Sequence, residues 1–166
     1  SKQQLKVYLL KKYLTKIKGA ASKKEVSLII DEIIANLEKI GEVFSPGLVD
    51  TKEKAESAGE YFRKEGIDII LVCPLGYSTG MVLLPCVKQL DITIRILNTH
   101  IDSSYDLKSA DAKVYLYHEG PCCIPEYASG LMSIDKKFKV RTGPFSSQRF
   151  WNEVKADCNG AAAARA

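Results

Sequence analysis

Short apolar stretches alternate along the chain with longer segments in which apolar residues recur at helical spacing. The most apolar stretch is residues 67–74 (IDIILVCP), which is rich in β-branched side chains. This composition is typical of a strand that is covered on both faces of a parallel sheet. Weaker strand patterns lie at residues 5–10, 42–49, 93–98 and 138–142.

Helix signals fill the segments between these strands. Ser22 and Glu25 form a capping-box pattern at the start of the first helix, and Gly41 closes it. Asp50 or Thr51 caps the second helix, which ends at Gly66. Further helices are predicted over residues 79–90, 124–132 and 145–166, whereas residues 112–117 fit either a strand or a helix.

The alternation of strands and helices predicts an α/β fold with a doubly wound, mostly parallel five-stranded sheet and helices on both faces. One of the five strands is predicted over residues 42–49, with an interruption at Pro46 and Gly47. Ligands of such sheets bind beyond the carboxyl ends of the strands. The loops near residues 11–20, 44–51, 74–79, 98–107 and 117–126 are therefore candidates for a functional surface.

Composition fits one globular domain over residues 1–166, with 46% apolar and 27% charged residues. No apolar run approaches the ~18 residues of a membrane span, and the first residues do not resemble a secretory signal. The five cysteines are odd in number and form no CxxC pair, which indicates reduced thiols and a cytoplasmic location. The alanine-rich end has no helix stop signal, so we expect the chain to be the N-terminal part of a longer one.

Basic residues gather at the start of the chain, where residues 1–24 hold eight lysines and no acid. This could suggest a nucleic-acid partner. The segment has no arginine and no aromatic recognition motif, however, so a solvated edge is the preferred interpretation.

The loop after the most apolar strand reads Gly76-Tyr77-Ser78-Thr79-Gly80 and fits the G-x-S-x-G pattern of a hydrolase nucleophile elbow. Ser78 would be the nucleophile of a small serine hydrolase. Its partners would be His118 and one of Asp102, Asp106 and Asp111. The chain has no upstream glycine-rich oxyanion loop. The alternative is that the glycines allow a tight turn while Ser78 or Thr79 caps the next helix.

Two further groups of residues invite a chemical reading. His100 and His118, with Asp102, Glu119 and Glu126, have the side chains of a metal site, but no HxH or HExxH spacing is present. Cys122 and Cys123 follow Gly120-Pro121 at a helix start, where packed cysteines are favoured over a reactive thiol. Walker and Gly-x-Gly-x-x-Gly motifs are also absent from the sequence.

The order of several motifs resembles the N-terminal region of the L-fucose/L-arabinose isomerase-like family. The resemblance covers roughly residues 43–166 and rests on order and spacing. The motifs are Leu48-Val49-Asp50-Thr51, Gly66-Ile67-Asp68, the Tyr-Ser-Thr loop, Leu83-Leu84-Pro85, Ile96-Leu97-Asn98, Gly120-Pro121, Val140-Arg141-Thr142-Gly143 and Phe150-Trp151.

This resemblance implies a flavodoxin-like domain that helps to wall the sugar site of a neighbouring subunit in a homo-oligomer. It implies an aldose–ketose isomerase whose full-length form uses Mn²⁺, with the metal ligands and the acid–base residues in later domains. No cofactor, metal ligand or catalytic residue is expected in this chain, which would be inactive alone, and no nucleic acid or membrane partner is expected.

The resemblance also implies substrate-binding positions. Tyr77, with Ser78 and Thr79 in the same loop, corresponds to an aromatic loop after the third strand. His100, His118 and Glu119 correspond to polar positions that reach toward the sugar. A non-catalytic module that binds a partner or ligand remains a third hypothesis beside the isomerase and the hydrolase.

Overall fold

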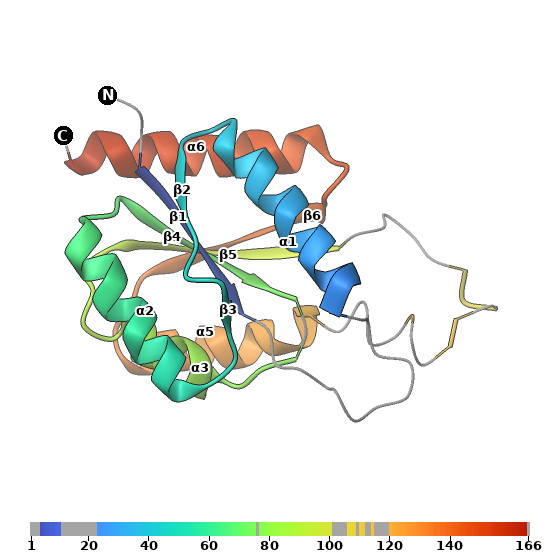
Figure 1. Cartoon of the computed structure of the whole chain (residues 1–166), viewed down its shortest axis with the longest axis horizontal. Coiled ribbons are helices and arrows are strands. Elements are labelled where there is room, and N and C mark those ends of the chain that lie inside the picture. Colours follow the sequence, from blue (N-terminus) through green and yellow to red (C-terminus); the bar gives the residue numbers. More distant parts are fainter. Residues whose placement is uncertain are drawn as a thin grey trace.

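A parallel sheet lies at the centre of the described part of the chain (Figure 1). The structure is a computed structural model that describes residues 4–10, 23–75, 77–100, 106–108, 110–111, 114 and 120–165, without the side chains of residues 4–10, 23–27, 100, 120 and 165. The strands are β1 (Gln4–Leu10), β2 (Glu42–Phe44), β3 (Leu48–Val49), β4 (Ile69–Pro74), β5 (Thr93–His100) and β6 (Phe138–Pro144). They follow the order β2-β1-β4-β5-β6, with β3 also paired to β1, and every pairing is parallel.

The prediction of a five-stranded sheet was wrong, because the sheet formed by the described residues has six strands. Both β2 and β3 pair with the same side of β1: β2 with residues 4–6 and β3 with Leu9 and Leu10. Pro46 cannot donate a ladder hydrogen bond, and Gly47 has φ of 77°, which is a left-handed conformation that ends a strand. The predicted interruption at Pro46 and Gly47 therefore divides one strand position into two short strands.

In the part of the chain whose elements the structure defines, five α-helices cover both faces of the sheet, as an α/β fold requires. They are α1 (Lys23–Glu38), α2 (Lys52–Glu65), α3 (Gly80–Val87), α5 (Ile124–Ser133) and α6 (Gln148–Arg165), and a 3₁₀ turn, η1 (Gly120–Cys123), precedes α5. In Figure 1, α1 and α6 lie on one face, whereas α2, α3 and α5 lie on the other. This arrangement confirms the doubly wound α/β class, and its strand order is compatible with flavodoxin-like folds.

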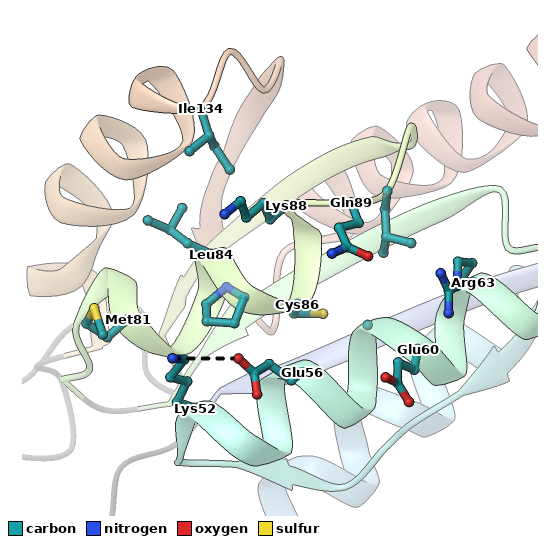
Figure 2. A pocket seen from close by; sticks show the side chains of 13 residues that line it. Lys52, Glu56, Glu60, Arg63, Met81, Leu84, Cys86, Lys88, Gln89 and Ile134 are labelled. Atoms are coloured by element: carbon teal, nitrogen blue, oxygen red, sulfur yellow. Dashed lines mark ion pairs between the residues drawn. The ribbon is translucent and has the colours of Figure 1, made fainter.

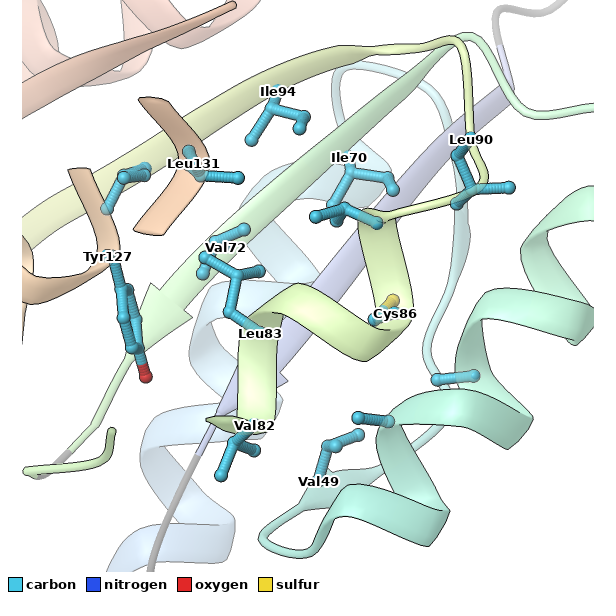
Figure 3. Packing of buried hydrophobic residues seen from close by; sticks show 14 of the residues in the cluster. Val49, Ile70, Val72, Val82, Leu83, Cys86, Leu90, Ile94, Tyr127 and Leu131 are labelled. Atoms are coloured by element: carbon cyan, nitrogen blue, oxygen red, sulfur yellow. The ribbon is translucent and has the colours of Figure 1, made fainter. Parts of the chain in front are cut away.

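The core divides into two clusters because β4 alternates its side chains between the two faces. Ile70 and Val72 pack under α2, α3 and α5, and Figure 3 shows them in the cluster that also contains Leu83 and Tyr127. Ile69, Leu71 and Cys73, which alternate with them along the strand, pack on the other face under α1 and α6. All six residues of β4 are buried, which confirms the prediction of a strand covered on both sides.

The predicted helix ends of α2 are confirmed. Thr51 is the N-cap, and its hydroxyl accepts a hydrogen bond from the Lys54 N–H at 3.3 Å. Gly66 closes the helix with φ of 62°, a conformation that favours glycine. The capping box proposed for α1 depends on Ser22, which lies outside the described residues.

A charged cluster joins β5, β6 and α6 on the face covered by α1 and α6. Asp157 accepts two hydrogen bonds from Arg141, at 2.5 Å from Nε and 2.8 Å from Nη2. Arg95 Nε lies 3.0 Å from the same carboxylate, and Glu153 bridges Arg141 and Arg149 at 3.5 and 3.1 Å. Burial opposes ionisation of Asp157, but the hydrogen bonds and charges of Arg141 and Arg95 outweigh it and lower the pKa of this carboxyl.

None of the helices that the structure describes combines the length and the apolar character that a membrane crossing requires.

Candidate functional site

The candidate site lies at the carboxyl edge of the sheet, where β4 passes into α3. Tyr77, Ser78 and Thr79 form the connection, and α3 begins at Gly80. Gly76, the first residue of the predicted motif, lies outside the described residues. The first turn of α5 stands against this connection and supplies the residues that hold it.

Two side-chain pairs join the loop to α5, and both span 49 residues of sequence. The Tyr77 hydroxyl donates to Glu126 Oε2 at 3.3 Å, and the Ser78 hydroxyl bonds to the Tyr127 hydroxyl. Glu126 Oε1 also accepts the Gly80 backbone N–H at 2.8 Å. Consecutive loop residues are thus tied to consecutive helix residues, which fixes the loop from two sides.

Ser78 does not have the geometry of a hydrolase nucleophile. A nucleophile elbow presents its serine oxygen at the surface, whereas Ser78 is 0% exposed and bonded to a tyrosine. Of its proposed partners, Asp102 and His118 lie outside the described residues. Asp106 and Asp111 instead accept the backbone N–H groups of Lys108 and Val114.

Replacing Tyr127 by phenylalanine should lower the free energy of unfolding by about 1 kcal/mol, because it leaves the buried Ser78 hydroxyl without its partner. Urea unfolding monitored by circular dichroism measures the loss. The control is the double variant Ser78→Ala/Tyr127→Phe, which removes both hydroxyls and should lose less than the sum of the single changes. Strict additivity would show that the two hydroxyls do not stabilise each other.

Tyr77 and Ser78 have opposite environments although they are adjacent. The Tyr77 side chain is 43% exposed beyond the carboxyl edge of β4. The negative charge of Glu126, and the hydrogen bond to it, raise the pKa of Tyr77, so its hydroxyl stays protonated at neutral pH. Because its hydroxyl proton is donated to Glu126, Tyr77 can offer a ligand an aromatic face and an oxygen that accepts a hydrogen bond.

Thr79 occupies the N-cap position of α3, as one of the two predictions for this loop required. Its side chain makes no cap hydrogen bond, and no acidic residue lies in the first turn of α3. The oxygen that bonds the first helical N–H comes instead from Glu126, on another helix. Neither Ser78 nor Thr79 therefore caps α3 through its side chain.

The other predicted substrate-binding residues are only partly described. His100 is the last residue of β5 and pairs in register with Pro144, which places it at the same carboxyl edge, but its side chain is not described. His118 and Glu119 lie outside the described residues. These three positions stay predictions.

Two buried polar atoms at the end of β5 extend this edge. Asn98 Oδ1 and Thr99 Oγ1 have no hydrogen-bond partner among the described residues, although Thr99 is only 9% exposed. Asn98 does donate through Nδ2 to the Thr142 hydroxyl at 3.2 Å. The sequence predicts that the loop at residues 98–107 belongs to the candidate surface, but it does not identify the side chains of Asn98 and Thr99.

The five cysteines are free, and four of them are buried. The prediction that Cys73 and Cys86 are small core residues is confirmed, and Cys123 is also packed at the helix start. Burial raises the pKa of Cys123, and burial together with Cys123 raises that of Cys73 to about 12. Both thiols are protonated at neutral pH and are poor nucleophiles, while Cys122 is exposed.

The site does not fit a divalent metal in the part of the chain that the structure describes. No group of three or more His, Cys, Asp or Glu side chains lies close enough together there to hold an ion. Glu126 already accepts two hydrogen bonds, and manganese prefers several oxygen ligands. In the structure Glu126 holds the loop through Tyr77 and Gly80. Its sequence neighbours do not reveal this role, because both partners lie more than 40 residues away in the chain.

A separate pocket of about 530 Å³ lies between α2 and α3 (Figure 2). Its lining combines charged side chains such as Arg63 and Lys88 with apolar ones such as Met81 and Leu84. Tyr77, Ser78 and Thr79, the predicted site residues whose side chains the structure describes, do not line it. The pocket and the loop of Tyr77 are therefore distinct features of the same face.

Comparison with known proteins assigns no family: no protein-family model matches the chain, and no curated protein is similar to it by sequence.

Proposed function

We propose that this domain forms one wall of the sugar site of an aldose–ketose isomerase of the fucose/arabinose type. Tyr77 is the residue that meets the sugar. The observation that carries the proposal is the exposed Tyr77 ring, held by Glu126 at the carboxyl edge of the sheet. Sugars present apolar C–H faces and hydroxyl groups, and an anchored tyrosine complements both.

The fold and the motif order support the same assignment. Ligands of doubly wound sheets bind beyond the carboxyl ends of the strands, where Tyr77 lies. The strand order is compatible with the flavodoxin-like class, to which we assign the domain. The five free cysteines are in keeping with the reducing cytoplasm, where we place the protein.

In this proposal the domain binds and orients sugar but does not catalyse the reaction alone. The described residues at the site include one carboxylate, Glu126, and it is engaged by Tyr77 and Gly80. The acid–base groups and the Mn²⁺ of the isomerase belong to other domains of the full-length protein. A neighbouring subunit of a homo-oligomer shares the sugar with this wall.

The test is aldose-to-ketose conversion by the full-length product of the gene. Supplied with Mn²⁺ and a panel that includes L-fucose and L-arabinose, the wild type should form ketose. Tyr77→Ala should raise KM about tenfold, because the loss of a stacking contact of about 1.4 kcal/mol corresponds to that factor. Tyr77→Phe keeps the ring and should have a smaller effect.

The matched control is Met132→Ala, which removes another exposed side chain, 71% accessible, from the same domain. It should leave KM unchanged. Conversion of no aldose by the wild-type protein would overturn the proposed function. Equal effects of Tyr77→Ala and Met132→Ala would remove Tyr77 from the sugar site.

A further inference from the structure

The N-terminus of α3 has no side-chain cap from its own segment, although the Thr79 carbonyl accepts the Val82 N–H at 3.1 Å. Thr79 makes no side-chain cap bond, and the first turn contains no acidic residue. The free N–H groups at the start of a helix carry a partial positive charge. Such an end at the carboxyl edge of a parallel sheet is the usual place for a phosphate, and in α3 its first residue, Gly80, is buried.

Glu126 occupies this place from α5. Its Oε1 lies 2.8 Å from the Gly80 nitrogen, so a carboxylate side chain already occupies the positive end of α3. Its other oxygen, Oε2, accepts the Tyr77 hydroxyl at 3.3 Å. The buried bond between Ser78 and Tyr127 holds the adjacent residues, so the carboxylate is supported on both sides.

We propose that Glu126 is a positioning and specificity-determining residue, whose carboxylate orients Tyr77 and closes the N-terminus of α3 to anionic ligands. The wall then accepts neutral polyhydroxy ligands and rejects phosphorylated ones. An approaching phosphate would meet a like charge at the position that would otherwise attract it. The ligand class rests on the proposed function, whereas the exclusion of anions rests only on this geometry.

Inorganic phosphate is the probe for the exclusion. In a titration of the ¹⁵N-labelled chain, the Gly80 and Met81 amide signals of Glu126→Gln should shift saturably, with a Kd at least tenfold below that of the wild type. Glu126→Ala, which removes the carboxylate entirely, is a second variant and should also gain phosphate binding. Glu153→Gln on α6 is the control, because it removes the same charge from a different face and should behave like the wild type.

A second measurement follows the phenol of Tyr77 by ultraviolet absorbance, with Tyr77→Phe as the blank. Glu126, Cys123 and Cys122 are the ionisable groups that act on it. In Glu126→Gln the pKa of Tyr77 should fall toward the ordinary value of tyrosine, about 10. Glu153→Gln should leave it unchanged, since a general loss of charge or stability would not act at Tyr77 selectively.

Equal phosphate affinity in the wild type and both Glu126 variants would overturn the proposal, and so would an unchanged titration of Tyr77. Both measurements use this chain without any sugar conversion. A full-length protein that converts no aldose would therefore refute the proposed function while leaving the exclusion of anions intact. A full-length protein that converts an aldose, together with unchanged phosphate affinity or an unchanged Tyr77 titration in the Glu126 variants, would refute only the role of Glu126.

Discussion

Replacing Asp157 by asparagine is expected to lower the free energy of unfolding by about 3 kcal/mol at pH 7. The change removes the negative charge that faces Arg141 and Arg95. The Arg141 and Arg95 side chains are 25% and 15% exposed, so water can replace the lost carboxylate only in part. An uncompensated charge of this kind is costly, whereas the intact bidentate pair is well satisfied.

The effect should depend on pH in a defined direction. The pKa of Asp157 is lowered in the folded state, so its stabilising contribution is fully present above the unfolded pKa of about 3.9. It is lost as pH falls through the lower folded value. The difference between wild type and Asp157→Asn should thus be constant from about pH 5 to 8 and shrink below about pH 4.

Urea unfolding at several pH values measures both effects. The control is Glu153→Gln, because this carboxylate is 34% exposed and one of its partners, Arg149, is 89% exposed. It should cost less than about 1 kcal/mol. A loss for Asp157→Asn no larger than that of Glu153→Gln would show that the cluster does not stabilise the fold.

Replacing Gly59 by alanine is expected to destabilise the domain by about 2–3 kcal/mol, although alanine is the better helix former. A Cβ atom at this position of α2 would lie 2.5 Å from the Cys86 carbonyl oxygen of α3. That oxygen belongs to the backbone, so one helix must move away from the other. The pocket between α2 and α3 would widen, because Gly59 and Cys86 both line it (Figure 2).

Gly160→Ala in α6 is the matched control. A Cβ atom there would have no neighbour within 4 Å. The substitution should stabilise the protein by about 0.5–1 kcal/mol, which is the propensity difference between glycine and alanine in a helix. Thermal and urea unfolding of the two variants give the comparison, and a stabilised Gly59→Ala would mean that α2 and α3 do not approach so closely.

Most of the fold follows from local patterns. The apolar run of β4 predicts both the strand and its burial, because it depends only on the residues of that strand. The capping residues of α2 likewise predict where this helix begins and ends. The broken strand at Pro46 and Gly47 was also visible, but its consequence for the strand count was not. Whether two short segments pair separately with β1 depends on register, which a local pattern does not contain.

The candidate site was predictable only in part. The position after a buried strand predicts the loop, whereas Tyr77 within it follows from the resemblance to the isomerase family, and the structure exposes its side chain. The pairing of Tyr77 with Glu126 and of Ser78 with Tyr127 was missed, since each joins residues 49 apart. Helical spacing on α5 shows which side chains lie on one face, but the angle at which α5 meets the loop comes from core packing.

The broken strand also affects how the sheet meets other chains. At one border of the described sheet, β2 has three residues and β3 has two, with Pro46 and Gly47 between them. An added strand would find no long row of free backbone groups there, which limits edge-to-edge aggregation. The opposite border, β6, has seven residues but carries Lys139 and Arg141 and ends at Pro144. Charged residues and a proline therefore limit strand addition at the β6 edge, and the break at Pro46 and Gly47 limits it at the edge formed by β2 and β3.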